Sequence, residues 1–195
     1  MSEFASKKNK YKIEGDKFII TPNNPRKSIT SALLDKKDKV IEYTNKQDNK
    51  IIEVISIEKN SIVTKYYDSW YPLVLIKPHT IFYSKDECKD IADRYLTLLQ
   101  DLDKTKKLLN NICSEYDKFT EYTGLHFNDK ASNNILVNKD ISDFRIIDIC
   151  SLNSHSRGPL SKNSHKRLLG YYRWIYIYDE YFTQIQIDNL LAQYE

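Results

Sequence analysis

Short apolar runs separated by polar turn residues predict β-hairpins in the first third of the chain. One pair of runs flanks Glu14-Gly15-Asp16, and a second pair flanks Glu58-Lys59-Asn60. The runs are Tyr11–Ile13 and Phe18–Thr21 in the first pair, and Ile51–Ile57 and Ser61–Tyr67 in the second. Apolar runs bounded by such residues are typical of paired strands. Residues 1–10 precede the first run and are expected to form a flexible tail.

Helical spacing of apolar residues marks three longer segments. Ser28–Thr44 has the pattern of an amphipathic helix. Ser84 and Glu87 form a capping box, and the apolar spacing behind it continues to about Tyr122, which predicts one long helix or two consecutive ones. Residues 166–194 have a helical pattern rich in aromatic side chains. Those aromatics are expected to pack in a core, with a partner-binding surface as the alternative.

Three oxygen-bearing side chains surround another predicted hairpin, between residues 124 and 152. Asn134 precedes the apolar run Ile135–Val137, and a second run after a polar turn ends in Asp148. A hairpin would put Asn134 and Asp148 at neighbouring strand ends. Asp129, on the preceding loop, could point into the same space. Such a set suits a Mg²⁺–phosphate site, in which an Asp that is not a ligand orients or deprotonates an attacking hydroxyl.

The composition favours one globular domain. Hydrophobic residues make up 41% and charged residues 29% of the 195 residues, and the net charge of +3 is too small to demand a nucleic-acid partner. Cys88, Cys113 and Cys150 show no C-x-x-C spacing, so neither a zinc site nor a disulfide framework is indicated. No signal peptide is visible, and no apolar run reaches the roughly 20 residues of a membrane span. We therefore expect a cytoplasmic protein without membrane contact.

Two segments resemble the protein-kinase-like superfamily. HFNDKASNNIL resembles the catalytic loop H-x-D-x-x-x-x-N, and RIIDIC resembles the strand that ends in the metal-binding Asp of that family. The resemblance implies an α+β, two-lobed, minimal kinase-like fold over residues 11–195. A small β-rich N-terminal lobe would occupy residues 11–78, and a truncated helical C-terminal lobe residues 79–195. Residues 77–82 would then lie near the hinge, where the adenine of ATP would bind.

The same resemblance assigns roles to individual residues. It implies Asp129 as the catalytic base, with Asn134 and Asp148 as Mg²⁺ ligands that also contact the cofactor ATP. Lys130 lies one position before the place of the lysine that follows the base in the family, and is included among the cofactor-binding residues.

The lysine that reaches the ATP phosphates from an N-terminal strand is left open by the sequence. Lys12, Lys17 and Lys27 all precede the first predicted helix, and no spacing argument separates them. Glu42 is a candidate for the helix glutamate that pairs with this lysine, although a solvated glutamate is the favoured interpretation.

These observations give three functional hypotheses. The first is an ATP- and Mg²⁺-dependent phosphotransferase, most simply a minimal Ser/Thr protein kinase acting on a protein substrate. The second is a pseudokinase or binding module, which the absence of a Gly-rich loop favours. The third is a small viral or phage structural or nucleic-acid-associated protein, because abundant Asn, Lys, Ile and Tyr indicate an AT-rich genome. Minimal members of the family are familiar as effectors, so a host cytoplasm is also an expected location.

Overall fold

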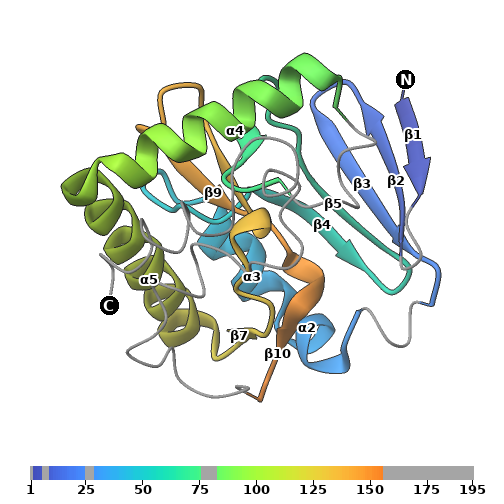
Figure 1. The fold of residues 1–195 in the computed structure, drawn as a ribbon. Helices are drawn as coiled ribbons and strands as arrows, with labels where there is room; N and C mark the ends of the chain where they lie inside the picture. Colours follow the sequence, from blue (N-terminus) through green and yellow to red (C-terminus); the bar gives the residue numbers. More distant parts are fainter. Residues whose placement is uncertain (1, 6–8, 25–28, 76–82, 156–195) are drawn as a thin grey trace. The chain divides into compact units, whose positions relative to one another are not determined.

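The computed structural model describes residues 2–5, 9–24, 29–75 and 83–155 of the chain (Figure 1). Three sequence predictions lie outside the described residues: the hinge of residues 77–82, the aromatic helices of residues 166–194 and the candidate Lys27. The fold is α+β, and it consists of two compact units. The described residues of the first unit come from Met1–Ser69, Ser114–Asp129 and Arg145–Arg157, and those of the second from Trp70–Cys113 and Lys130–Phe144. Each unit is discontinuous in sequence, whereas the sequence predicts contiguous lobes divided at residue 78.

A five-stranded antiparallel sheet forms the larger part of the first unit. Its spatial order is β1-β2-β3-β5-β4. The strands are β1 (Ser2–Ala5), β2 (Asn9–Glu14), β3 (Lys17–Pro22), β4 (Val54–Glu58) and β5 (Ser61–Lys65). Both hairpins predicted from the apolar runs are confirmed. The predicted tail is wrong: residues 2–5 pair with residues 10–13 of β2, so hydrogen bonding to the sheet orders this segment.

The strand register assigns each side chain to one face of the sheet. Directly paired residues share a face. The buried face includes Ile62 and its neighbours Ile57 and Ile20, and it extends to Tyr11 and Phe18, whose rings stack 5.6 Å apart. Toward β2 this face is only half-buried. It therefore continues as an apolar surface beyond the part covered by the described residues.

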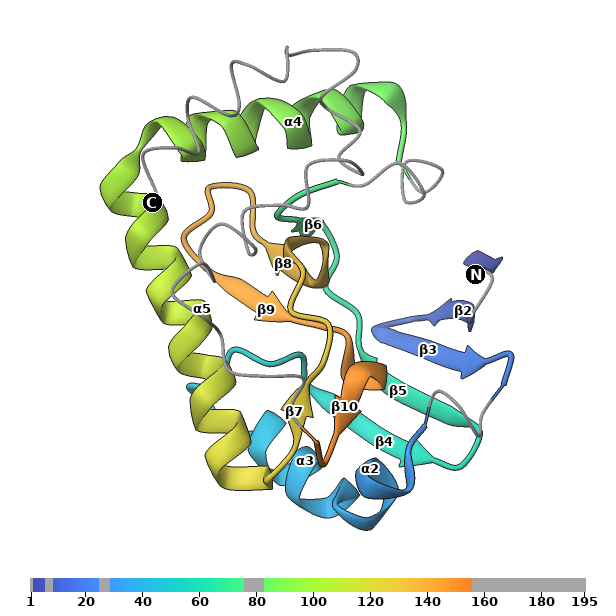
Figure 2. The ribbon, with the colours of Figure 1, turned by 60° about the horizontal axis from the view of Figure 1, so that its bottom comes forward.

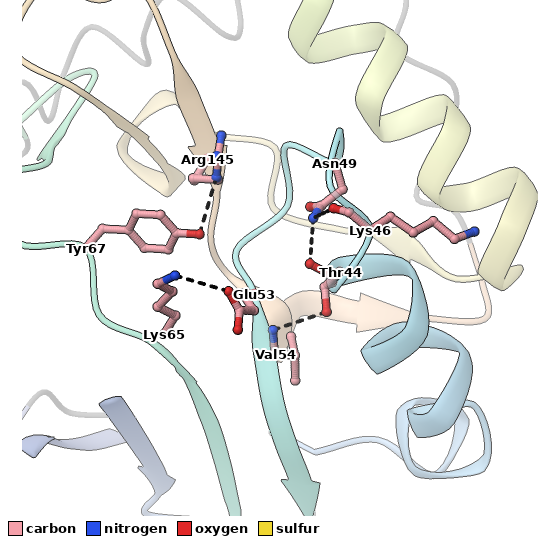
Figure 3. Close-up of polar contacts among 8 residues, drawn as sticks. All are labelled: Thr44, Lys46, Asn49, Glu53, Val54, Lys65, Tyr67 and Arg145. Atoms are coloured by element: carbon pink, nitrogen blue, oxygen red, sulfur yellow. Dashed lines mark hydrogen bonds and ion pairs between the residues drawn. The ribbon is translucent and has the colours of Figure 1, made fainter. Parts of the chain in front are cut away.

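Two short helices connect β3 to β4. The predicted single helix over residues 28–44 is instead α2 (Ser31–Asp35) and α3 (Lys37–Thr44), with a break at Lys36. The hydroxyl of Thr44, the last residue of α3, accepts a hydrogen bond from the Val54 amide (3.1 Å), as Figure 3 shows. Asn49 donates to the Thr44 and Lys46 carbonyls in the intervening loop. These bonds satisfy the helix end and fix the start of β4.

Two consecutive helices follow, as the sequence predicts. They are α4 (Lys85–Gln100) and α5 (Leu102–Thr123), and the capping box of Ser84 and Glu87 is present at the start of α4. Asp101 separates the two helices, and its carboxylate accepts the Lys104 amide (3.0 Å). Residues 102–113 of α5 belong to the second unit, and residues 114–123 belong to the first.

The second unit also contains a small sheet with the order β6-β8-β9. Its strands are β6 (Tyr71–Pro72), β8 (Ile135–Val137) and β9 (Phe144–Ile146), the last of which continues into the first unit. The Asn138 amide donates to the Asp143 carbonyl (3.3 Å) at the turn between β8 and β9. The hairpin predicted from the two apolar runs is confirmed.

Among the described helices, none combines the length and apolar character needed to cross a membrane.

A left-handed glycine ends α5. Gly124 has φ +67°, and its amide donates to the Thr120 carbonyl (2.7 Å). The chain then enters β7 (His126–Phe127), which pairs antiparallel with β10 (Leu152–Asn153), as Figure 2 shows. Gly124 therefore directs the chain from the helix into the segment that carries Asp129.

We predict that Gly124→Ala lowers the free energy of unfolding by about 1 kcal/mol, because a side chain disfavours this conformation. A Cβ there would also lie 2.5 Å from Lys36 Nζ, which is the mobile end of a side chain. Gly15→Ala is the matched comparison, since Gly15 has φ +60° and no atom within 4 Å of the added Cβ. Urea denaturation of both variants measures how much a side chain at positive φ lowers the free energy of unfolding. Unchanged stability in both would contradict the assigned turn geometry.

Candidate active site

Hydrogen bonds of the first unit connect the backbones beside Asp129 and Asp148. The Asn128 amide donates to the Ser151 carbonyl (3.3 Å). The Ser151 amide and hydroxyl both donate to the Asp148 carbonyl at 2.9 Å. Asp129 directly follows Asn128, so two hydrogen-bonded steps join the segments that carry these carboxylates. Asp129 is exposed and Asp148 is half-exposed, which leaves both within reach of a ligand from solvent.

The aromatic face of α5 fixes the position of β7. Phe127 is buried and contacts Tyr116 and Phe119, with ring centroids 5.2 and 5.1 Å away. Tyr116 and Phe119 are themselves fully buried on α5. Since tilted and edge-on ring contacts are favourable, this cluster holds the residue that lies two positions before Asp129.

The approach to Asp148 is fixed by a short parallel bridge. The Ile146 amide donates to the Lys50 carbonyl, and the Ile52 amide donates to the Ile146 carbonyl, both at 2.8 Å. Asp148 then departs from strand geometry (φ −34°, ψ 59°) and precedes the 3₁₀ turn Ile149–Ser151. The carboxylate consequently lies at a sharp change of chain direction, directly after a hydrogen-bonded strand.

Arg145 on β9 and Lys65 on β5 both lie near the Tyr67 ring, with their cationic groups 5.5 and 5.8 Å from its centroid. The Arg145 Nε donates to the Tyr67 hydroxyl (3.4 Å), and Lys65 forms an ion pair with Glu53 (3.4 Å), as Figure 3 shows. The Lys65 and Glu53 side chains are 45% and 39% exposed. Exposed pairs of this kind contribute little to stability. Arg145 therefore projects from the side of β9 that is opposite to the side of its buried neighbour Ile146.

Asn134 and Lys130 belong to the second unit. Asn134 is buried at the end of the 3₁₀ helix Ser132–Asn134, directly before β8. Its side-chain oxygen accepts a hydrogen bond from Asn133 Nδ2 (2.9 Å). Lys130 is half-exposed on the preceding loop. The structure thus places Asp129 and Asp148 in one unit on segments that are joined by hydrogen bonds, and the participation of Asn134 and Lys130 stays a prediction.

The strand register separates the candidate lysines from the buried face of the sheet. Lys12 pairs with Ile19, and Lys17 pairs with Lys65, so both lysines project from the face opposite Phe18. Lys12 also forms an ion pair with Glu14. Glu42 is exposed and accepts a hydrogen bond from the Tyr122 hydroxyl. Within the described ranges, neither Lys12 nor Lys17 therefore has the orientation expected of a lysine that pairs with a helix glutamate.

The Cys150 thiol lies two residues after Asp148, and the charge of Asp148 affects the pKa of this thiol. Burial, and after it the negative charge of Asp148, raise the pKa of this thiol to about 12. A thiol with this pKa is protonated at neutral pH and is a poor nucleophile. Cys150 is therefore not a candidate catalytic nucleophile.

Asp148 offers the carboxylate donor type that Mg²⁺ takes from proteins. The described residues contain no group of three or more His, Cys, Asp or Glu side chains that could hold a metal. Mg²⁺ commonly takes one or two carboxylates and completes its coordination with water and phosphate oxygens. Asp148, half-exposed at the end of a fixed strand, has the donor type and accessibility for such a partial site.

A buried oxygen beside Asp129 has no hydrogen-bond donor among the described residues. The Asn128 side-chain oxygen is inaccessible to solvent, and no residue in the described part of the chain donates to it. An unsatisfied buried acceptor costs about 1–3 kcal/mol. A functional role is one explanation of such a group, and the position of Asn128 directly before Asp129 adds it to the candidate site.

Sequence reasoning did not identify Asn128 or Glu115. Asn128 has no distinguishing signal in the sequence. Glu115 has one: it falls on the buried stripe formed by Ile112, Tyr116 and Phe119, where a charged residue is unexpected. The structure shows it to be 4% exposed and hydrogen-bonded to Tyr43 and to the Lys50 amide.

No protein-family model matches the chain, and comparison with curated proteins also found no match.

We predict that Asn128→Leu raises the melting temperature of the ligand-free protein, because it removes an unsatisfied acceptor while keeping a similar shape. Asn138→Leu is the control, since the Asn138 oxygen accepts the Ser142 and Asp143 amides (2.9 and 3.0 Å) and its loss should destabilise the fold. Thermal denaturation distinguishes the two. Equal destabilisation would mean that the Asn128 oxygen is bonded in solution.

We predict slow alkylation of Cys150 by iodoacetamide. The raised pKa lowers the thiolate fraction at pH 8, and a shift from 9.0 to about 12 corresponds to roughly a 1,000-fold slower reaction than in unfolded protein. Asp148→Asn should accelerate the reaction, because it removes the neighbouring negative charge. Mass spectrometry after timed labelling gives both rates. An identical rate in the variant would show that Asp148 does not act on the thiol.

Proposed function

We propose that the chain is a minimal protein-kinase-like phosphotransferase that uses ATP and Mg²⁺. The observation that carries this proposal is the hydrogen-bonded connection between the segments of Asp129 and Asp148 in one unit. A carboxylate that accepts a proton beside a carboxylate that binds metal is the arrangement that phosphoryl transfer requires. The resemblance of the surrounding segments to the kinase-like superfamily gives the reaction its class.

The proposed roles follow from accessibility and chemistry. Exposed Asp129 would orient a Ser or Thr hydroxyl of a protein substrate and accept its proton. Asp148 would hold Mg²⁺, with Asn134 as a second ligand and Lys130 near the phosphates on the strength of the resemblance alone. When bound, Mg²⁺ would supply positive charge that offsets the charge of the phosphate oxygens.

The architecture of the first unit supports the same proposal. Its antiparallel sheet has helices inserted between β3 and β4, and the long helix α5 leads into the segment of Asp129. The half-buried apolar side chains around Tyr11 and Phe18 offer a surface on which an adenine ring could stack. These features are compatible with a small β-rich lobe of a kinase-like fold.

A pseudokinase is the second candidate, and the orientation of the lysines favours it. Lys12 and Lys17 project away from the buried face of the sheet. The chain also lacks a Gly-rich loop among its four glycines. A protein with these features would bind nucleotide and a partner protein without transferring phosphate.

We predict that the purified protein, incubated with labelled ATP, Mg²⁺ and a mixed lysate, transfers label to protein, and that Asp129→Asn lowers the transfer at least about 100-fold, as expected for loss of a general base. Asp148→Asn should abolish the Mg²⁺-dependent stabilisation by ATP, which is about 2.7 kcal/mol at a concentration of 100 Kd. Both substitutions should leave the fold intact because neither side chain is fully buried.

Asp117→Asn is the matched control, because Asp117 is exposed on α5 in the same unit. Stabilisation by ATP without label transfer would establish the pseudokinase instead. Absence of both effects in the unmodified protein would refute nucleotide-dependent function of either kind.

A further inference from the structure

A buried carboxylate joins three segments of the first unit. Glu115 lies on α5 and is 4% exposed. Its Oε1 atom accepts hydrogen bonds from the Tyr43 hydroxyl (2.9 Å) and from the Lys50 amide (3.1 Å). Tyr43 belongs to α3, and Lys50 belongs to the loop before β4. One oxygen atom therefore connects a helix, a second helix and a loop that are separate in sequence.

The Glu115 carboxylate affects the pKa of one donor, Tyr43, and supplies an acceptor to the other donor, the Lys50 amide. Burial, the hydrogen bond to Glu115 and the negative charge of Glu115 all raise the pKa of Tyr43. The hydroxyl therefore stays protonated and continues to donate. The Lys50 amide is a backbone group that would lose this partner if the carboxylate were removed. A buried backbone donor without a partner is strongly disfavoured.

Backbone hydrogen bonds continue from the Lys50 segment to Asp148. The Lys50 carbonyl accepts the Ile146 amide, and the Ile146 carbonyl accepts the Ile52 amide, at 2.8 Å each. Ile146 ends β9, and Asp148 follows two residues later. The carboxylate that fixes the Lys50 amide thus lies at the start of a hydrogen-bonded path that ends beside the proposed metal ligand.

We infer that Glu115 is a positioning residue for Asp148, acting through the Lys50–Ile52 segment and β9. The inference rests on the proposed function for its effect on Mg²⁺. Glu115 touches neither reactant, so its role is to hold the strand that delivers the ligand. Residues that hydrogen-bond metal ligands directly influence metal affinity by about 10–100-fold, and we expect the lower end of this range for the indirect path from Glu115.

An apolar residue at position 115 could pack in the same place but could not accept the hydrogen bond from the Lys50 amide. An apolar side chain in place of a buried charge is often neutral or stabilising for folding, because a buried charge is costly to desolvate. It would, however, remove the carboxylate acceptor of the Lys50 amide and with it the hydrogen bond that ties the Lys50–Ile52 segment to α5. Glutamine would keep a side-chain oxygen that can accept the same bonds.

The test compares Glu115→Met, which removes the acceptor, with Glu115→Gln, which keeps one. Two quantities are measured: amide hydrogen exchange at Ile52 and Ile146, and the Mg²⁺ concentration that gives half-maximal thermal stabilisation by ATP. We expect Glu115→Met to accelerate both amides and raise the half-saturating Mg²⁺ concentration by about 10-fold. Glu115→Gln should resemble the unmodified protein in both measurements. Glu121→Met, exposed on the same helix, controls for the substitution itself.

Unchanged exchange or unchanged Mg²⁺ dependence in folded Glu115→Met would overturn the inference, and so would equal effects of Glu121→Met. If Glu115→Met does not fold, the inference is tested on the unmodified protein by measuring native-state amide hydrogen exchange in low denaturant. The amides of Lys50, Ile52 and Ile146 should then open together, and much faster exchange of Lys50 alone would overturn the inference. If ATP and Mg²⁺ do not bind the unmodified protein, the proposed function fails and the role of Glu115 toward a metal ligand falls with it, whereas the exchange data still report the path from Glu115 to β9.

Discussion

Backbone groups that enter the interior of the first unit need hydrogen-bond partners, and the Glu115 carboxylate supplies one where α3, α5 and the Lys50 segment meet. The rest of the unit depends on this contact because the Lys50–Ile52 segment bonds to Ile146 on β9 and then continues directly into β4. Losing it would remove the carboxylate acceptor of the part-buried Lys50 amide, and an unsatisfied buried donor costs about 1–3 kcal/mol. A single side chain therefore influences both the sheet and the strand that leads to Asp148.

Helix α5 contacts the segments that lead to both candidate site aspartates, Asp129 and Asp148. Its rings Tyr116 and Phe119 hold Phe127, two residues before Asp129, and its Glu115 holds the segment that fixes the approach to Asp148. A site supported by a buried helix is held more accurately than one supported by loops alone. The two carboxylates thus have a firm structural support, whereas Lys12 and Lys17 face away from the buried side of the sheet. The first feature favours phosphate transfer, and the second favours nucleotide binding without transfer.

Local signals in the sequence predicted local structure well. The capping box at Ser84, the turn at Gly15 and the hairpin turn between β8 and β9 all depend on residues close in sequence, and all are present. The expected tail was wrong because its order comes from pairing with β2, and the expected single helix failed at Lys36, where α2 ends and α3 begins. The order of residues 2–5 was not visible in the apolar pattern, since it depends on a partner strand. The apolar spacing continues through Lys36 and therefore did not mark the break between α2 and α3.

The sequence by itself determined the α+β class, most of the strands and helices, and the spacing of Asp129, Asn134 and Asp148, because turn chemistry and apolar periodicity are local properties. Tertiary structure decided which face of the sheet carries Lys12 and Lys17, since facing follows from the register between strands. It also decided that Glu115 binds a distant backbone amide and that the Asn128 oxygen is buried without a described donor. These properties arise only when segments far apart in the chain pack together, and residue spacing along one segment carries no record of them.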